Sequence, residues 1–347
     1  MRVSLKDVAR EAGVSISLVS RTYTRGASLA PGTRAKITKA SKNFGYWPNV
    51  LARSLITQES KIIALAVSYL ENQFYPAVIT TLLPELMNRR YHALLFTEDE
   101  VNSAERVVNQ IMAYPIASVL VASVGVSSEI AVECGKARIR VVIINQRAND
   151  QAGSCSATGD SVRGGWEIGE FLFASGHERI GYLAGKENPL TSNEREEGLL
   201  AALAAGRRDL HSKGRGDYVF ERATEETRKL LSRKTALDAI FCANDHMAIA
   251  AMEVAKFEFG IQIPKDLSIV GSDDVGPSKW RSLALTTFEQ PVNEMCELAL
   301  ELLFERIDDA VKTGEDLQSS HVNTQGALSV CNSARVPASG SEMIDGR

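Results

Sequence analysis

The sequence lacks the features that are typical of membrane, secreted and metal-binding proteins. No apolar run approaches the roughly 18 residues that a membrane-spanning helix needs, and no apolar signal-peptide stretch follows Met1. The five cysteines are odd in number and include no CxxC pair, and the five histidines show no metal-ligand spacing. We therefore expect a cytoplasmic protein with no disulfide framework and no metal site.

Signatures of the common enzyme classes are missing as well. Gly185 and Lys186 suggest a phosphate-binding loop, but its first glycine is absent and Glu187 replaces Ser or Thr. No GxGxxG motif follows an expected first strand, and no GxSxG motif occurs. The adjacent Asp273 and Asp274 would point to opposite faces of a strand. We expect neither catalysis nor a cofactor.

Charge is divided unevenly along the chain. The whole sequence carries a formal net charge of -4, but residues 1–58 hold ten basic and two acidic residues, which is +8 and leaves -12 for the remainder. A basic segment joined to an acidic body is typical of a protein that contacts nucleic acid at one end. The pattern therefore predicts a DNA-binding N-terminal domain.

The N-terminal segment has the pattern of a helix-turn-helix. Four apolar residues recur at helical spacing and predict a first helix over residues 5–12, which Gly13 ends. Ser15 is a good N-cap for a second helix over residues 16–23. Two short helices joined by a three-residue turn form a helix-turn-helix, although the same pattern also fits a small helical bundle with no role in DNA binding. The apolar positions of the first helix are Leu5, Val8, Ala9 and Ala12.

The start of the second helix is the expected reading surface. Ile16, Ser17 and Arg21 lie on one exposed face of that helix. Arg21 can make a bidentate contact to guanine, Ser17 can donate or accept a hydrogen bond, and Ile16 can contact a thymine methyl group.

A third helix and a short hinge helix follow. Six residues between Thr33 and Tyr46 fit the third helix, which would close the small domain. Pro48 disfavours helix just before it, and Asn49 can cap a new helix of fewer than two turns. Because so short a helix is marginal in water, we expect it to fold only when packed against a dimer mate on DNA. The six positions are Thr33, Arg34, Ile37, Ala40, Phe44 and Tyr46.

In order and spacing, five blocks of these residues resemble the headpiece and hinge of the LacI/GalR (lactose-repressor/galactose-repressor) family. The blocks are Asp7-Val8-Ala9, Ala12-Gly13-Val14-Ser15, Val19-Ser20-Arg21, Thr33-Arg34 and Gly45-Tyr46-x-Pro48-Asn49-x-x-Ala52-Arg53-Ser54-Leu55. The resemblance implies that Leu55 wedges into a central operator step, with Ala52 near that step and Asn49 and Ser54 close to the DNA backbone. It further implies DNA contacts by Ser4, Leu5, Ser15, Ser20, Thr33 and Arg34. The chain departs from the family pattern at Leu18, where Thr is usual, at Thr22, Tyr23 and Thr24, and at Ala30.

The acidic body has alternating apolar strands and helix-length segments. This order predicts two doubly wound subdomains with parallel sheets, and ligands bind such sheets at the carboxyl ends of their strands. Two sheets whose strand ends face each other would form a cleft. The expected strands cover residues 62–68, 93–97, 118–122, 140–145, 179–185, 239–243 and 267–272.

The body resembles the effector-binding core of the same family, which is similar to periplasmic sugar-binding proteins. Supporting motifs include Gly176-His177-x-Arg179-Ile180-Gly181 and Ala243-Asn244-Asp245-x-Met247-Ala248. Matching the motifs predicts effector contacts by Phe74 and Tyr75 on the loop after the first strand, by Gln146 and Arg147 after the fourth, by Arg195 at a helix start, and by Tyr218, Asn244 and Asp273. These groups suit a polyhydroxylated ligand, and two arginines leave room for a sugar acid or a phosphate. Alternatively, Arg195 and Asp273 simply pair with each other, and the tyrosines are packing residues.

The resulting prediction is an all-α helix-turn-helix headpiece on a periplasmic-binding-protein-like α/β core. We expect a homodimeric repressor that binds pseudo-palindromic operator DNA under the control of a sugar or sugar derivative. The alternatives are a nucleobase or other non-sugar effector, or a solute-binding protein, which would explain the body but not the basic head. The expected divisions are residues 1–46 (headpiece), 47–59 (hinge), 60–157 with 290–318 (first subdomain), 158–289 with 319–332 (second subdomain) and 333–347 (disordered tail).

Overall fold

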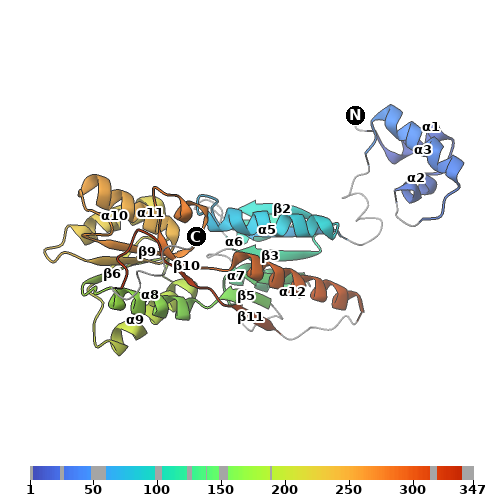
Figure 1. Cartoon of the computed structure of the whole chain (residues 1–347). Coiled ribbons are helices and arrows are strands. Elements are labelled where there is room, and N and C mark those ends of the chain that lie inside the picture. The colour runs from blue at the N-terminus through green and yellow to red at the C-terminus, as the bar shows by residue number, and fades with distance from the viewer. Residues whose placement is uncertain are drawn as a thin grey trace. The chain divides into compact units, whose positions relative to one another are not determined.

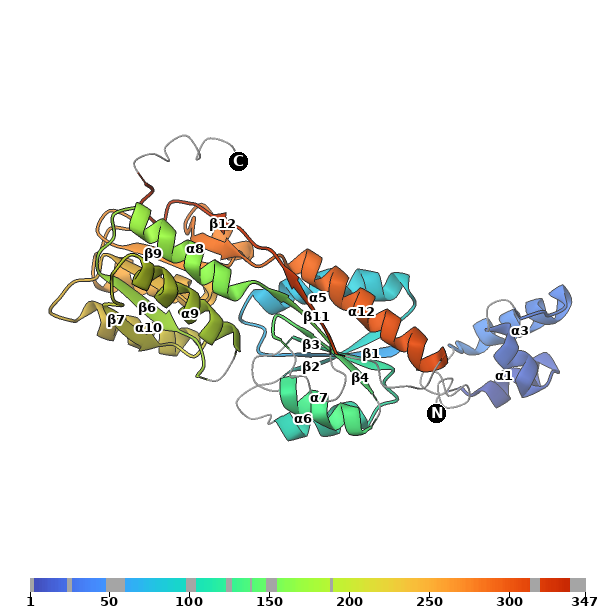
Figure 2. The ribbon, with the colours of Figure 1, turned by 90° about the horizontal axis from the view of Figure 1, so that it is seen from below.

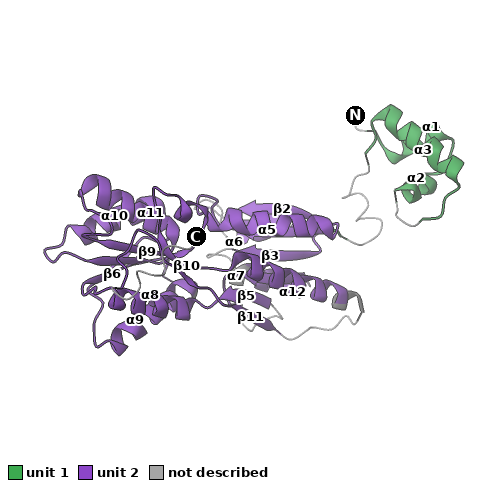
Figure 3. Ribbon diagram, viewed as in Figure 1, with its two compact units in different colours: residues 1–61 green, residues 62–347 purple. Residues whose placement is uncertain are grey.

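The computed structural model describes residues 3–23, 27–47, 60–97, 104–122, 127–137, 139–147, 155–187, 190–312 and 319–337. The chain forms two compact units, residues 1–61 and residues 62–347 (Figure 3). None of the described helices is both long and apolar enough to cross a membrane.

The described residues of the first unit form a headpiece of three helices, α1 (Leu5–Ala12), α2 (Ile16–Thr22) and α3 (Pro31–Phe44). The turn between α1 and α2 depends on Gly13, whose φ of 64° is a left-handed conformation that favours glycine. Five small or branched apolar side chains hold the helices together, which is the arrangement that the helical spacing predicts. They are Val8, Ala9, Val19, Ile37 and Ala40.

In the second unit, the described residues form two six-stranded sheets. The first sheet has the order β11-β5-β4-β3-β1-β2, and all its pairs are parallel. Its strands are β1 (Ile62–Val67), β2 (His92–Thr97), β3 (Ser118–Ala122), β4 (Arg140–Ile144), β5 (Cys155–Gly159) and β11 (Ser320–Thr324). The second sheet has the order β12-β10-β9-β8-β6-β7, and only the β10–β12 pair is antiparallel. Its strands are β6 (Ile180–Ala184), β7 (Ser212–Arg215), β8 (Ala239–Cys242), β9 (Ser268–Asp273), β10 (Thr286–Glu289) and β12 (Leu328–Ser329).

Helices cover both faces of each sheet, as apolar parallel strands require (Figures 1 and 2). In the first sheet, α5 and α12 pack on one face and α6 and α7 on the other. In the second sheet, α8 and α9 lie on one side and α10 and α11 on the other. The helices are α5 (Phe74–Asn88), α6 (Ala104–Met112), α7 (Ser127–Lys136), α8 (Ser161–Ala174), α9 (Leu190–Ala205), α10 (Phe220–Leu231), α11 (Asp245–Glu253) and α12 (Val292–Lys312), with a π-helix at Val254–Glu258 and a 3-10 helix at Gly276–Lys279.

The chain passes between the two sheets after β5, after β10 and after β11. The predicted subdomain boundaries at residues 157 and 318 are therefore too early, because β5 and β11 both belong to the first sheet. The structure moves these crossings to residues 160 and 325–327.

The predicted tail also begins too early, because residues 333–335 are part of the second sheet's core. The Ser333 hydroxyl donates to the Ile269 carbonyl at 2.5 Å and accepts from the Thr286 N–H at 2.8 Å. The Ser333 carbonyl accepts from the Ile269 N–H at 2.8 Å. Ser333 and Ala334 are buried.

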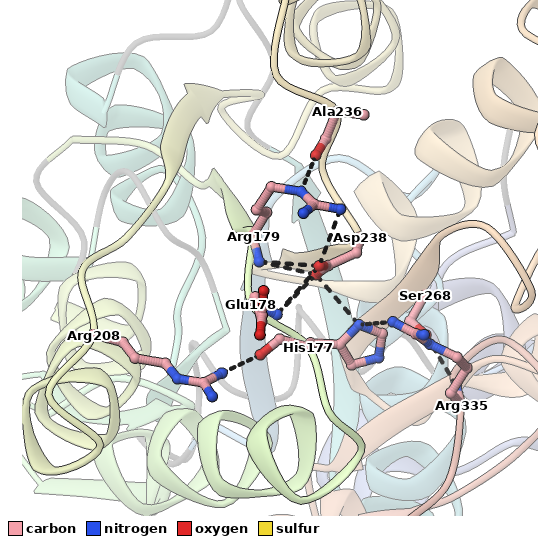
Figure 4. Close-up of polar contacts among 8 residues, drawn as sticks. All are labelled: His177, Glu178, Arg179, Arg208, Ala236, Asp238, Ser268 and Arg335. Carbon is pink, nitrogen blue, oxygen red and sulfur yellow. Dashed lines mark hydrogen bonds and ion pairs between the residues drawn. The ribbon is translucent and has the colours of Figure 1, made fainter.

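A buried polar cluster fastens the same segment to the second sheet (Figure 4). Arg335 Nη2 lies 2.8 Å from His177 Nδ1, and the Arg335 N–H donates to Ser268 Oγ at 2.9 Å. His177 Nδ1 also lies 3.4 Å from Asp238 Oδ1, and Arg208 donates to the His177 carbonyl. Burial, followed by the charge of Arg335, lowers the pKa of His177 to about 4. His177 therefore joins three parts of the subdomain as a neutral, structural group.

Candidate functional site: a DNA-binding face and a ligand pocket

The start of α2 carries an exposed polar face. Ser15 caps the helix by accepting from the Leu18 N–H at 3.4 Å, and its hydroxyl lies 2.9 Å from that of Ser17. Ser15, Ile16, Ser17 and Arg21 are exposed, whereas Val19 on the opposite face is buried in the headpiece core. The structure thus places the predicted reading residues together on the solvent side of the second helix.

The other predicted headpiece contacts have defined structural positions. Ser4 caps α1 in a reciprocal capping box, in which its N–H and hydroxyl both donate to Asp7 Oδ2, at 3.0 and 2.7 Å. Arg34 donates to the Thr22 and Ala27 carbonyls at 3.0 and 3.1 Å, which joins α3 to the segment after α2. Leu5, Ser20 and Thr33 are half-buried. Their contacts with DNA stay predictions, and Asn49, Ala52, Ser54 and Leu55 lie outside the described residues.

Leu18, where the family pattern has Thr, turns inward. Its side chain is half-buried and packs against the headpiece core. The substitution therefore adds apolar packing at a position where the family pattern offers a hydroxyl.

A small pocket, whose empty space including open solvent is about 270 Å³, lies where strands of both sheets end. The first sheet contributes residues that follow β1 and β4, and the second contributes residues at the ends of β7, β8 and β9 and from α9. This is the position that the strand-end rule for parallel sheets predicts. The lining residues are Asn72, Phe74, Tyr75, Asn145, Thr191, Arg195, Tyr218, Asn244 and Asp273.

Six of the eight predicted effector residues line the pocket, namely Phe74, Tyr75, Arg195, Tyr218, Asn244 and Asp273. Two of their expected positions are wrong in detail. Phe74 and Tyr75 begin α5 rather than lying on a loop, because Asn72 Oδ1 accepts from the Phe74 N–H at 3.1 Å and starts the helix. Arg195 lies more than one turn inside α9, which begins at Leu190.

Gln146 and Arg147 are not among the lining residues, and their ligand contacts stay a prediction. Gln146 is half-buried and Arg147 is exposed. Sequence reasoning missed Asn72, Asn145 and Thr191. The spacing of Thr191 from Arg195 is a signal for the last of these, because residues four apart share a helix face.

A buried ion pair forms the centre of the pocket. Arg195 Nη2 lies 3.0 Å from Asp273 Oδ1, and the two side chains are 3% and 4% exposed. Arg195 Nη1 donates to the Ala243 carbonyl. Burial disfavours the charged guanidinium, but the charge of Asp273 holds the pKa of Arg195 above its ordinary value. Arg195 is therefore a fixed cation whose charge is already paired.

A second carboxyl group lies behind this pair. Asp245 is fully buried and accepts from the Thr287 hydroxyl at 2.5 Å and from the Val275 N–H at 3.1 Å. Burial, and then the charge of Asp273, raise the pKa of Asp245 to about 8. Asp245 therefore holds a proton in the folded protein at neutral pH.

Two further features of the pocket are typical of ligand sites. Asn145, Tyr218 and Asp273 have φ angles of 63°, 64° and 139°, in the left-handed region that side chains disfavour. Asn145 Oδ1, Arg195 Nε, the Tyr218 hydroxyl and Asn244 Nδ2 are buried with no hydrogen-bond partner among the described residues. An unpaired buried polar group costs about 1–3 kcal/mol, so these four atoms favour contact with a polar ligand.

Family models match both units of the chain. Residues 4–49 match the model for bacterial regulatory proteins of the lacI family, and residues 170–328 match a periplasmic binding protein-like domain. The chain thus carries a lacI-family DNA-binding domain followed by a periplasmic-binding-protein-like domain. Its α/β core is the periplasmic-binding-protein-like fold that the sequence predicts.

Individual proteins support the same assignment. The HTH-type transcriptional regulator GalS of Salmonella typhimurium is 29% identical over 306 residues, which are 86% of this chain and 88% of GalS. A complex of the transcriptional regulator CelR with cellobiose has a TM-score of 0.69 at 26% identity, over 96% of this chain and 100% of CelR. The lac repressor dimer bound to operator and the anti-inducer ONPF has a TM-score of 0.79 over 96% of this chain and 99% of that one, and at 22% identity the likeness concerns the fold.

With its lacI-family domain, the chain is a DNA-binding transcriptional repressor. The relatives that it matches are regulators of transcription rather than enzymes.

The proton on Asp245 makes the stability of the α/β core depend on pH. The pKa of Asp245 is about 8 in the folded protein and near 4 for an ordinary aspartate, so the folded state keeps a proton that the unfolded state releases. Folding stability is thus fully present at low pH and falls as pH rises toward about 8. The opposing effect of His177, with its pKa of about 4, is confined to pH values below its ordinary pKa of about 6.5.

We therefore expect the free energy of unfolding to fall by about 1–2 kcal/mol between pH 6.5 and 8. Asp245→Asn keeps an oxygen for the Val275 N–H and removes the titrating group, so its unfolding free energy should change little over the same range. Urea unfolding of both proteins at four pH values measures this, and a parallel decline in the variant would assign the effect to another group.

Proposed function

We propose that this LacI-family chain is a homodimeric repressor whose affinity for a pseudo-palindromic operator is set by a small carbohydrate-like ligand in the pocket between the two sheets. The observation that carries the proposal is a pocket lined from both sheets, with a buried ion pair and unpaired amide and guanidinium atoms. Hydroxyl groups both donate and accept hydrogen bonds, so a polyol suits this mixed set. The cellobiose complex of CelR supports a carbohydrate.

Contacts between the two halves of the core offer a means of control. The Tyr69 hydroxyl, after β1, donates to the Tyr218 carbonyl, after β7, at 2.5 Å. A ligand that contacts both sheets would favour one spacing of the halves over others. Coupling of this kind between a ligand and a DNA site typically amounts to about 1–3 kcal/mol. We propose that the hinge helix predicted after Pro48 transmits it to the headpiece.

The proposed dimer has a candidate surface at the edge of the first sheet. The edge strand β2 presents Leu95, which is 45% exposed, and the neighbouring helix α5 presents Met87, which is 70% exposed. An exposed apolar edge strand is an unfavourable feature in a monomer, and a second copy of the chain would cover it. The lac repressor dimer on its operator supports this assembly.

A ligand screen tests the control mechanism. The melting temperature of the full chain would be measured with neutral mono- and disaccharides and with nucleobases, since the rings of Phe74, Tyr75 and Tyr218 also offer stacking faces. A saturable rise with one compound identifies the effector class, because a ligand that binds only the native state stabilises it. Operator sequences selected from random DNA would then be titrated with and without that compound. An unchanged operator affinity would count against control through the pocket.

Arg21→Ala tests the reading surface. Arg21 is exposed at the reading face of α2, and a lost bidentate contact to guanine costs about 1–3 kcal/mol of discrimination. We expect preference for the selected operator over scrambled DNA to fall about tenfold or more. Arg10→Ala is the matched control, since Arg10 is an exposed arginine on α1. It should weaken both DNAs alike, and retained discrimination in Arg21→Ala would remove Arg21 from the reading set.

A further inference from the structure

The pocket contains one strong cation, and its charge is already compensated. Among the described residues that line the pocket, Arg195 is the only Lys or Arg. Its guanidinium is held between Asp273, at 3.0 Å, and the Ala243 carbonyl. A ligand anion would therefore have to displace Asp273 or approach an ion pair with no net charge.

The described surroundings of this pair supply no second buried cation. Asp245, buried beside Asp273, is protonated and uncharged, and Lys279 is paired with Asp274 at 3.1 Å. Glu194 is half-buried on α9 beside Arg195. Arg147, the second arginine of the sequence prediction, is exposed and does not line the pocket. His246 packs against the rings of Tyr69 and Phe220, and burial lowers its pKa, which favours the neutral form.

The buried pocket atoms that have no hydrogen-bond partner among the described residues mostly belong to neutral groups. Asn145 Oδ1 is an acceptor, Asn244 Nδ2 is a donor and the Tyr218 hydroxyl can act as either, and all three are buried. The fourth such atom, Arg195 Nε, belongs to the guanidinium that Asp273 already neutralises. This set suits a ligand hydroxyl or carbonyl better than a carboxylate or a phosphate, which would leave Asn145 Oδ1 facing an anion.

We infer that the ligand of this pocket is uncharged, and that uronic acids, sugar phosphates and other anions are excluded from it. The inference rests on the proposed function and narrows its ligand class. A buried charge that lacks a partner costs several kcal/mol, and every 1.4 kcal/mol is a factor of ten in affinity. A neutral sugar should therefore bind at least about a hundredfold more tightly than its anionic analogue.

The test uses anionic probes and does not require the effector to be known. The melting temperature of the full chain would be measured with acetate, glucuronate, glucose 6-phosphate and inorganic phosphate, at an ionic strength held constant with sodium chloride. We expect no saturable stabilisation of the natural protein by any of the four. Stabilisation by one of them that disappears in Arg195→Met would overturn the inference.

The variant Asp273→Asn tests the opposite case, in which the charge of Arg195 is no longer paired. This change frees the charge of Arg195 without removing the shape of the side chain, so the variant should be less stable and should recover several degrees on addition of acetate or glucuronate. The double variant Arg195→Met/Asp273→Asn has no cation to pair and should not respond. A folded Asp273→Asn protein that gains no response to carboxylates would contradict the inference, and if that variant does not fold, the anion series on the natural protein decides. Failure of every neutral compound to change operator affinity would instead count against the proposed function.

Discussion

Arg195→Met should lower the free energy of unfolding of the core by about 3–5 kcal/mol and abolish the response to the effector. The substitution keeps an unbranched side chain and removes the side-chain partner that the described residues give to the Asp273 carboxylate, which is 4% exposed. Asp273 would then lie beside Asp245 with no compensating cation, and both would compete for protons. The penalty should therefore be larger at pH 8 than at pH 5, where protonation neutralises Asp273. Urea unfolding at the two pH values measures the difference.

The double variant Arg195→Met/Asp273→Asn is the control for this result. It removes both charges, so most of the lost stability should return while the response to the effector stays absent. Such a cycle separates the cost of an unpaired charge from the loss of ligand contacts. A loss below about 1 kcal/mol in the single variant would mean that Asp273 finds another partner.

Gly165→Ala should destabilise the core and weaken effector binding, although Gly165 does not line the pocket. Helices α8 and α9 touch through glycine, and a Cβ on Gly165 would lie 2.1 Å from the Arg195 carbonyl oxygen and 3.0 Å from the Leu199 nitrogen. These are backbone atoms, which cannot rotate away from the added Cβ as a flexible side chain can. Helix α9 must therefore shift, and Arg195 shifts with it. We expect a loss of about 1–3 kcal/mol in stability and roughly tenfold weaker effector binding.

Gly32→Ala is the matched substitution for Gly165→Ala. Gly32 is also helical, but a Cβ there meets nothing within 4 Å, so effector binding and core stability should not change. The two readouts are the effector dissociation constant by calorimetry and unfolding in urea. Unaltered effector binding in Gly165→Ala would show that α9 tolerates the shift without moving Arg195.

The apolar strands could be predicted from sequence, but the polar ones could not. The strand Ile62–Val67 is buried throughout and reads as a continuous apolar run. The strand Cys155–Gly159 is equally buried but contains Ser, Thr and Gly, and it pairs with a second polar strand, Ser320–Thr324. Their side chains bond across the pair, with Thr158 Oγ1 2.7 Å from Asn323 Oδ1 and Ser156 Oγ 2.8 Å from His321 Nδ1. These strands are held by side-chain hydrogen bonds rather than by apolar packing, so the pattern of apolar residues in the sequence did not indicate either strand.

Pocket residues could be predicted from the sequence where a family motif falls at the end of an expected strand. Asn244 caps α11 directly after β8, and Asp273 ends β9, so both lie where the strand-end rule places ligand contacts. Asn145 was missed because the predicted strand ran one residue too far and included it. The inward direction of Leu18 and the proton on Asp245 depend on neighbours from other parts of the chain, which a single sequence does not reveal.

The late position of residues 333–335 has a consequence for synthesis on the ribosome. The three described headpiece helices lie within the first 47 residues, so the sequence of these helices is complete early in synthesis. By contrast, an edge strand of each sheet of the core lies as late as residues 320–329. Arg335, which contacts His177, follows it by 158 positions in the sequence. A chain that stopped at residue 330 would contain every residue of the headpiece and of the pocket but would lack Ser333 and Arg335. A chain truncated this late would thus keep the headpiece helices but would lack contacts that hold the ligand-binding core together.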